Sequence, residues 1–161
     1  MTDWIRTGLI GIITAMATGC GQPPEGFLWE VTLTATLDEC NDPVVPYRET
    51  FDYVVDLSSP PVASIAVGDE GIFATGRISG DFIDYSSVIW TDYRNNGDEI
   101  RWQISGEAQF RTGGTNGTLP DGIDWLGTEQ FEIVDSFDED LEVGCTFVMA
   151  SEGTFKEELG G

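Results

Sequence analysis

Acidic side chains are the main groups in this chain that could do acid–base chemistry, because histidine is absent. The 161 residues include 29 Asp and Glu, 7 Lys and Arg, and no His. Without His there is no Ser-His-Asp triad, no Cys-His pair and no His-ligated zinc site. Two carboxylates could still hydrolyse a sugar bond, and Glu107 and Asp124 are the nearest candidates. The simpler interpretation is that Glu107 is an outward-facing residue of a strand and that Asp124 is an acid in a loop. We therefore expect a protein that is not an enzyme.

The densest acidic stretch is the candidate for binding a hard cation such as Ca²⁺. Its carboxylates are Asp135, Asp138, Glu139, Asp140 and Glu142. Clustered carboxylates supply the oxygen ligands that Ca²⁺ prefers, but the spacing of an EF-hand and its central glycine are absent. The alternative is a solvated acidic loop that keeps the domain soluble. The body of the chain predicts no other metal or cofactor.

Cys20 ends a short apolar run near the N-terminus. Residues 8–16 are about nine apolar or small residues, too few for a helix that crosses a bilayer but enough for the core of a signal peptide. Residues 17–20, Ala-Thr-Gly-Cys, resemble the lipobox of bacterial lipoprotein signal peptides, with Ala17 where that pattern prefers Leu. An ordinary signal peptide and a buried N-terminal helix are the alternatives.

The resemblance implies cleavage after Gly19, a lipid thioether on Cys20 and acylation of the new amine, for example with palmitate. Several acyl chains would anchor the protein stably in a membrane, and residues 20–26 would form a short tether. By the same resemblance, Gly21 in place of Asp favours the outer membrane over retention at the inner one. We expect a lipid-anchored protein of the cell envelope, with its periplasmic or surface exposure left open.

The other two cysteines, Cys40 and Cys145, are predicted to form a disulfide. Once Cys20 carries lipid, they are an even number in an oxidising compartment. A bridge between them would close a loop of about 100 residues, which stabilises a fold by about 4–5 kcal/mol in the chain-entropy model. Two separate buried thiols are the alternative.

Alternation of apolar and polar residues runs through residues 27–158. Period two with one apolar face is typical of antiparallel sheet solvated on one side. We expect a helical signal segment at 1–19, the tether, one all-β domain at 27–158 and a tail at 159–161. The expected strands are 28–37, 49–57, 62–67, 71–79, 82–93, 99–111, 128–135 and 143–150.

Eight strands joined mostly by short turns predict a meander. The alternating strand directions put Cys40, after the first strand, at the same end as Cys145, near the start of the last strand. Their bridge would join the first and last strands, as closure of an up-and-down barrel requires. We therefore expect a closed or nearly closed barrel, with a β-sandwich as the alternative.

The negative charge of the chain is both large and uneven. The formal net charge of −22 argues against nucleic-acid binding, which needs basic patches. The same strand directions gather the acid-rich connections at the end of the domain away from the tether. These connections contain residues 38–42, 69–70, 98–99 and 138–142.

Aromatic residues on the expected strands could either line a ligand cavity or fill a core. The candidates for ligand contact are Tyr85, Trp90, Trp102, Phe110 and Trp125. Eight-stranded barrels can enclose one small ligand. Residues 26–29, Gly-Phe-Leu-Trp, are similar to the Gly-x-Trp motif of lipocalins and avidin-like proteins with one extra residue, and no site residues are carried over from those families.

Two classes of function stay open for the body of the chain. The first is a non-enzymatic envelope lipoprotein that acts as a binding or interaction module. The second is a small-molecule carrier with a cavity inside a lipocalin-like barrel. Residues 82–93 are apolar on both faces, so one face either packs under the loop at 112–127 or offers a surface to a partner.

Overall fold

The computed structural model describes residues 26–40, 48–68, 72–93, 97–112, 118–137 and 141–160. The strands in these residues are β1 (Gly26–Asp38), β2 (Arg48–Ser59), β3 (Val62–Val67), β4 (Ile72–Ser79), β5 (Phe82–Ser87), β6 (Trp90–Tyr93), β7 (Glu99–Phe110), β8 (Trp125–Ser136) and β9 (Thr146–Leu159). This part of the chain contains no helix long and apolar enough to span a membrane. The predicted signal segment, most of the tether and Cys20 lie outside the described residues.

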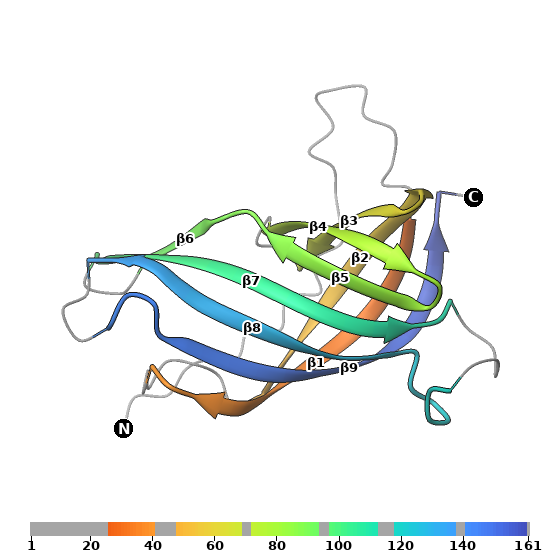
Figure 1. Ribbon diagram of the computed structural model, residues 1–161. Helices are drawn as coiled ribbons and strands as arrows, with labels where there is room; N and C mark the ends of the chain where they lie inside the picture. Colours follow the sequence, from red (N-terminus) through yellow and green to blue (C-terminus); the bar gives the residue numbers. More distant parts are fainter. Residues whose placement is uncertain are drawn as a thin grey trace, which may run out of the picture.

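Eight of the strands close into an antiparallel barrel (Figure 1). Strands β1 to β5 and β7 to β9 pair in meander order, β5 pairs with β7, and β9 returns to pair with β1. The short β6 continues along β7 beyond the end of β5. This closure confirms the predicted barrel and excludes the β-sandwich alternative, because the sheet meets itself edge to edge.

The inner face of the barrel follows the predicted alternation. On β7, Trp102, Ile104 and Ala108 are buried, whereas Ser105 and Glu107 between them are exposed. Because successive side chains of a strand point to opposite faces, every second residue of the wall enters the interior. The interior is therefore a packed core, and the polar residues coat the outside.

The strand expected at residues 82–93 is interrupted. β5 ends at Ser87 and β6 begins at Trp90, and the register of β6 against β7 is shifted by one residue relative to that of β5. One extra residue in a strand is a β-bulge, which bends the strand and increases its twist. The intervening Val88 and Ile89 are exposed, so the apolar residues of this segment do not all pack inside.

The last strand is longer than the expected 143–150. β9 pairs with β1 along almost its whole length, from Phe147 to Leu159, which lies opposite Gly26. Its continuation is inconspicuous in the sequence, because the inward positions there are the small Ser151 and Gly153. Because these inward residues are small and not strongly apolar, the alternation of apolar and polar residues cannot be recognised there from the sequence.

The acid-rich connections are attached to strand ends on one side of the barrel, as the alternating directions of the strands require. These are the end of β1, the β3–β4 and β6–β7 connections, and the segment between β8 and β9. The described acids in or beside them are Asp38, Glu39, Asp98, Glu99 and Glu142. The remaining acids of these connections lie outside the described residues.

Candidate functional site

A buried carboxyl group lies inside the barrel. Glu129 points inward from β8 and is 1% exposed. Its Oε1 accepts hydrogen bonds from the hydroxyl of Tyr53 on β2, at 2.6 Å, and from the hydroxyl of Tyr85 on β5, at 2.8 Å. Its Oε2 has no hydrogen-bond partner in the part of the chain that the structure describes. The cluster therefore connects β8 through the interior to two other strands of the wall.

Glu129 was not among the predicted site residues, although one pattern in the sequence points to it. It precedes Phe131 and Ile133 at even spacing, and alternation places both of these in the core. An acid at an inward position of such a strand is expected to be buried. Its partners leave no comparable pattern, because Tyr53 and Tyr85 are 76 and 44 positions away.

A glycine makes room for the contact between Tyr85 and Glu129. Gly106 of β7 is the register partner of both residues, so it lies between them on the inner face. A Cβ at this position would lie 2.6 Å from the hydroxyl oxygen of Tyr85 and closer still to its ring. Glycine in a strand often marks such a close approach, and here it lets the Tyr85 side chain cross β7.

Burial sets the protonation of this cluster. Complete burial raises the pKa of the Glu129 carboxyl from 4.5 to about 7, and the hydrogen bonds from the two tyrosines act in the opposite direction. Burial, followed by the nearby Glu129, raises the pKa of Tyr53 and of Tyr85 well above 10. Both tyrosines therefore remain hydrogen-bond donors, while Glu129 exchanges its proton near neutral pH.

Aromatic rings separate the cluster from solvent. The ring of Trp125 lies 5.6 Å from that of Tyr53, 6.2 Å from that of Tyr85 and 5.8 Å from that of Trp29, measured between centroids. A general acid or base must come within hydrogen-bond distance of the proton that it transfers. Glu129 is enclosed by these rings, so the geometry assigns it to holding the wall together and not to acid–base chemistry on a substrate.

The other aromatic residues predicted to face a ligand also point into the packed interior. The buried ones are Tyr85, Trp102, Phe110 and Trp125. Trp102 contacts Phe147 with centroids 5.3 Å apart, and Phe110 contacts Trp29 at 5.9 Å. Such distances are typical of favourable edge-to-face ring pairs. Trp90 belongs to β6, and its side chain is outside what the structure describes.

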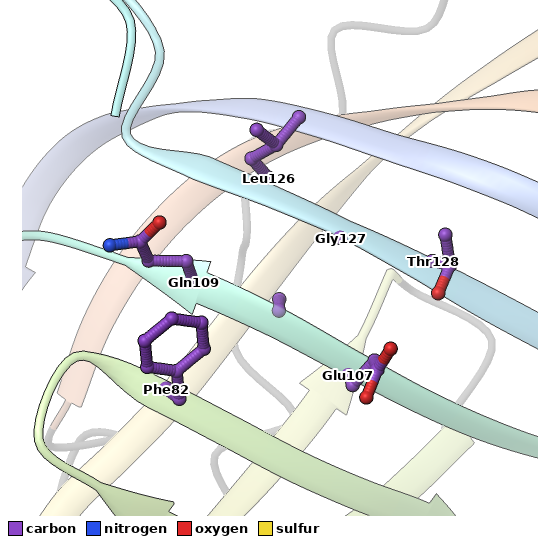
Figure 2. A pocket seen from close by; sticks show the side chains of 7 residues that line it. Phe82, Glu107, Gln109, Leu126, Gly127 and Thr128 are labelled. Atoms are coloured by element: carbon purple, nitrogen blue, oxygen red, sulfur yellow. The ribbon is translucent and has the colours of Figure 1, made fainter. Parts of the chain in front are cut away.

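A groove lies on the outer face of the wall formed by β5, β7 and β8 (Figure 2). It has a volume of about 460 Å³ and is lined by Phe82, Glu107, Gln109, Leu126 and Thr128, with Ala108 and Gly127 at its floor. The Phe82 ring is 55% exposed, and Leu126 is 37% exposed. This volume falls in the range of small-molecule sites, and an aromatic ring is directly accessible from solvent.

The polar groups of this groove offer mainly hydrogen-bond acceptors. The amide nitrogen of Gln109 donates to Asp81 Oδ2 at 2.5 Å and to Thr118 Oγ1 at 2.6 Å, which employs both of its N–H groups and leaves the carbonyl oxygen. The Glu107 carboxylate makes no hydrogen bond or ion pair with the described residues. Asp84 on β5 is the register partner of Glu107, so the position directly opposite Glu107 on the adjacent strand is also acidic.

The two candidate carboxylates for sugar-bond hydrolysis lie in different surroundings. Glu107 lines the outer groove, whereas Asp124 precedes β8 and is held by structural contacts. The Nε of Arg111 donates to Asp124 Oδ1 at 2.6 Å, and the backbone N–H of Phe155 donates to Oδ2 at 3.0 Å. The indole N–H of Trp29 donates to the Arg111 carbonyl at 3.0 Å. These contacts close the end of the barrel at which β1 begins.

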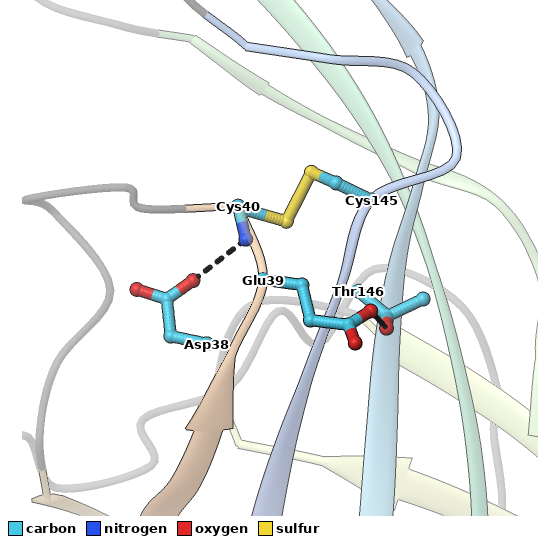
Figure 3. Close-up of a disulfide and its surroundings, with 5 residues drawn as sticks. All are labelled: Asp38, Glu39, Cys40, Cys145 and Thr146. Carbon is cyan, nitrogen blue, oxygen red and sulfur yellow. Dashed lines mark hydrogen bonds between the residues drawn. A yellow bond between two sulfur atoms is a disulfide. The ribbon is translucent and has the colours of Figure 1, made fainter.

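The predicted disulfide joins Cys40, just after β1, to Cys145, just before β9 (Figure 3). The Cα atoms are 5.2 Å apart across a sequence separation of 105. The Cys40 N–H donates to Asp38 Oδ1 at 2.9 Å, and the Thr146 hydroxyl donates to Glu39 Oε2 at 2.9 Å. The bridge thus confirms the predicted link between the first and last strands at the acidic end.

The predicted cation-binding stretch is described only in part. The Oδ2 of Asp135 lies 3.1 Å from Nη1 of Arg101 on the outer face, so a base already neutralises this acid. Glu142 lies in the turn before Cys145, and residues 138–140 fall outside the described ranges. Among residues 26–40, 48–68, 72–93, 97–112, 118–137 and 141–160, no three Asp, Glu, His or Cys are arranged to hold a metal ion.

Three exposed apolar side chains lie at the β5–β6 break, and a fourth lies at the far end of β6. Phe73, Val88, Ile89 and Tyr93 are between 55% and 66% exposed, and we call them the bulge surface. The backbone N–H of Val88 donates to the Phe73 carbonyl at 2.9 Å, which brings these two residues together. β6 pairs with β7 alone among the described strands, so no strand that the structure describes covers its other edge.

Comparisons with protein-family models, with curated proteins and with solved structures find no match for this chain. No ligand, partner or activity is therefore carried over from a relative.

Proposed function

We propose that this chain is a lipid-anchored lipoprotein of the bacterial cell envelope, in the outer membrane, and that it serves as a non-enzymatic module for binding another protein. The lipobox-like residues 17–20 support the anchor. The bulge surface supports the binding role, because its four large apolar side chains are more than half exposed on or near a strand edge that no described strand covers. Apolar groups gathered on a surface mark interaction sites more often than scattered ones do.

The chemistry of the bulge surface suits a partner in an extended conformation. The edge of β6 that no described strand covers offers backbone donors and acceptors to an added strand. Phe73 and Val88 offer apolar contact area next to it, and full burial of such a side chain contributes about 1.5–3 kcal/mol. β6 has only four residues, and short edge strands limit uncontrolled sheet pairing.

The carrier alternative receives less support. The ring contacts around Trp125 favour a filled interior over a cavity for a ligand. Native mass spectrometry of the protein purified from its own host tests this alternative. A retained small molecule that leaves on unfolding would favour the carrier and count against the interaction module.

The anchor is tested by metabolic labelling with radioactive palmitate. The wild-type chain should incorporate label, and the Cys20→Ser variant should not, because the thioether forms on the cysteine sulfur. Equal label in both chains would contradict the anchor without affecting the argument for the bulge surface.

The binding role is tested by placing a photo-cross-linking amino acid at Val88 or Ile89 in cells of the source organism. A matched probe at Glu152, which is exposed on β9, controls for random collisions. We expect one defined adduct from the two bulge positions, none from position 152, and loss of the adduct when Phe73→Ser is added. The same adducts from all three positions would contradict the proposal.

A further inference from the structure

We propose that the outer groove over β5, β7 and β8 binds the pyranose ring of a neutral carbohydrate. This site is separate from the bulge surface and does not depend on the protein-binding role. Two features of the groove support it: one exposed aromatic ring and a polar lining that accepts hydrogen bonds.

The aromatic ring provides the first contact. Phe82 begins β5 and is held in register between Ser79 of β4 and Gln109 of β7, yet its ring stays 55% exposed. The face of an aromatic ring is electron-rich, and a pyranose has a face of C–H bonds that can pack on it. Leu126 on β8 adds a second apolar contact across the groove.

The acceptors provide the second contact. The Gln109 carbonyl oxygen and the two oxygens of Glu107 are available, whereas the Gln109 N–H groups are bound to Asp81 and Thr118. Acceptors call for a ligand that brings donors, and a pyranose carries several hydroxyl groups around one ring. Because Asp81 and Thr118 already fix Gln109, little side-chain entropy is lost when a ligand binds.

Charge restricts the kind of sugar. Glu107 has no cationic partner among the described residues, and Asp84 lies opposite it in the register. Arg77 of β4 lies opposite Asp84 in turn, so it is Glu107, together with the net charge of −22, that repels uronic acids, sialic acids and phosphorylated sugars. An organic amine would satisfy the charge, but it offers one donor group to acceptors that are spread along the groove (Figure 2). A neutral sugar fits the aromatic ring and the separated acceptors together.

The test is a microarray of neutral, acidic and amino glycans probed with the purified full chain, followed by calorimetric titration of the best glycan. Phe82→Ala removes the exposed ring. Phe137→Ala is the matched control, because Phe137 is 62% exposed just beyond the far end of β8 and does not line the groove. Spermidine is titrated in parallel as the amine probe, and melting temperatures verify that each variant is folded.

We expect neutral glycans to bind, Phe82→Ala to weaken binding about tenfold, as loss of one aromatic contact predicts, and Phe137→Ala to leave it unchanged. Glu107→Gln should admit acidic glycans that the wild type rejects. The proposal is overturned if no glycan binds, if acidic glycans bind best, if only spermidine binds, or if both Phe variants weaken binding equally. If the bulge surface were shown to bind no protein, the expected results for glycan binding at the groove would stay the same.

Discussion

The barrel closes along two seams that are built differently. Where β1 meets β9, the strands share 12 register pairs and a disulfide joins the chain next to them; we call this the terminal seam. Where β5 meets β7, five register pairs are followed by the bulge; we call this the middle seam. Here the Tyr85 side chain crosses Gly106 to Glu129, so a hydrogen bond replaces the covalent link.

The difference shows two ways of holding a sheet edge to itself. The terminal seam relies on its long ladder of paired residues and on the disulfide, which reduces the conformational entropy of the unfolded chain. The middle seam relies on the hydrogen bond between Tyr85 and Glu129 inside the barrel. This hydrogen bond depends on the protonation state of Glu129 and on the lack of a side chain at Gly106. The outer groove and the bulge surface both lie along the middle seam, the one with fewer backbone pairs.

Removal of the disulfide should destabilise the fold more than any single substitution at the middle seam. Cys40→Ala with Cys145→Ala frees a loop with a sequence separation of 105, and the unfolding free energy should fall by about 4–5 kcal/mol. Urea unfolding of the wild type, the double variant and the reduced wild type measures this. The last two should agree, and a loss below about 1 kcal/mol would show that the ladder alone holds the terminal seam.

Gly106→Ala breaks the middle seam without touching the terminal one. The new Cβ would force Tyr85 away from Glu129, so overpacking and a lost buried hydrogen bond together should destabilise the fold by about 3–4 kcal/mol. Ser105→Ala, at the neighbouring outward-facing position of β7, is the control, because the Ser105 side chain is exposed. Adding Tyr85→Phe to Gly106→Ala separates steric strain from the lost hydroxyl contact. If Gly106→Ala costs no more than the control does, Tyr85 does not need the gap.

The fold should also lose stability as pH rises, because ionised Glu129 places a charge in the core behind the middle seam. The folded chain keeps the Glu129 proton up to about pH 7, whereas the unfolded chain releases it near 4.5. The stability that protonation of Glu129 contributes is therefore fully present below about pH 4.5 and declines between pH 4.5 and 7. Above about pH 7 it has been lost and changes no further. The total decline is on the order of 3 kcal/mol.

The pH effect is measured by denaturant unfolding at pH 5 and pH 8 for the wild type and Glu129→Gln. The neutral amide cannot ionise, so the wild type should lose more stability than the variant over this range. Taking the difference between the two removes the general repulsion among surface acids. Parallel pH curves would mean that Glu129 does not change its protonation in this range.

Asp124→Asn should have the smallest effect, because its contact with the terminal seam, to the N–H of Phe155 on β9, can be kept. It weakens the contact with Arg111 at 2.6 Å but keeps an acceptor for Phe155, so we expect a loss of about 1–2 kcal/mol. Thermal unfolding monitored by Trp fluorescence measures it. A loss as large as that of Gly106→Ala would mean that the end of the barrel, and not the middle seam, limits stability.

The barrel and its disulfide could be predicted because both follow from alternation and strand direction. Inward residues such as Ile104 and Ile133 recur at period two, and an even number of strands brings Cys40 and Cys145 to one end. The side on which Glu129 lies could be predicted by the same rule. These features depend on local pattern and need no knowledge of distant partners.

The rest could not be predicted, because it depends on contacts between distant strands. The pattern over residues 82–93 does not show that β6 shifts register against β7. Nothing near Gly106 shows that a tyrosine of another strand will occupy its missing side chain. The exposure of Phe82 likewise depends on its position beside β7 and not on its neighbours in sequence.

The position of the disulfide has a mechanical consequence. Gly26 and Leu159 are register partners at one end of β1 and β9, and the bridge lies beyond the other end. A force pulling these two residues apart would open the ladder pair by pair, like a zipper, until the tension reached Cys40 and Cys145. The chain between these cysteines would then carry no load, so β2 to β8, with the groove, would be shielded from a pull on the chain ends.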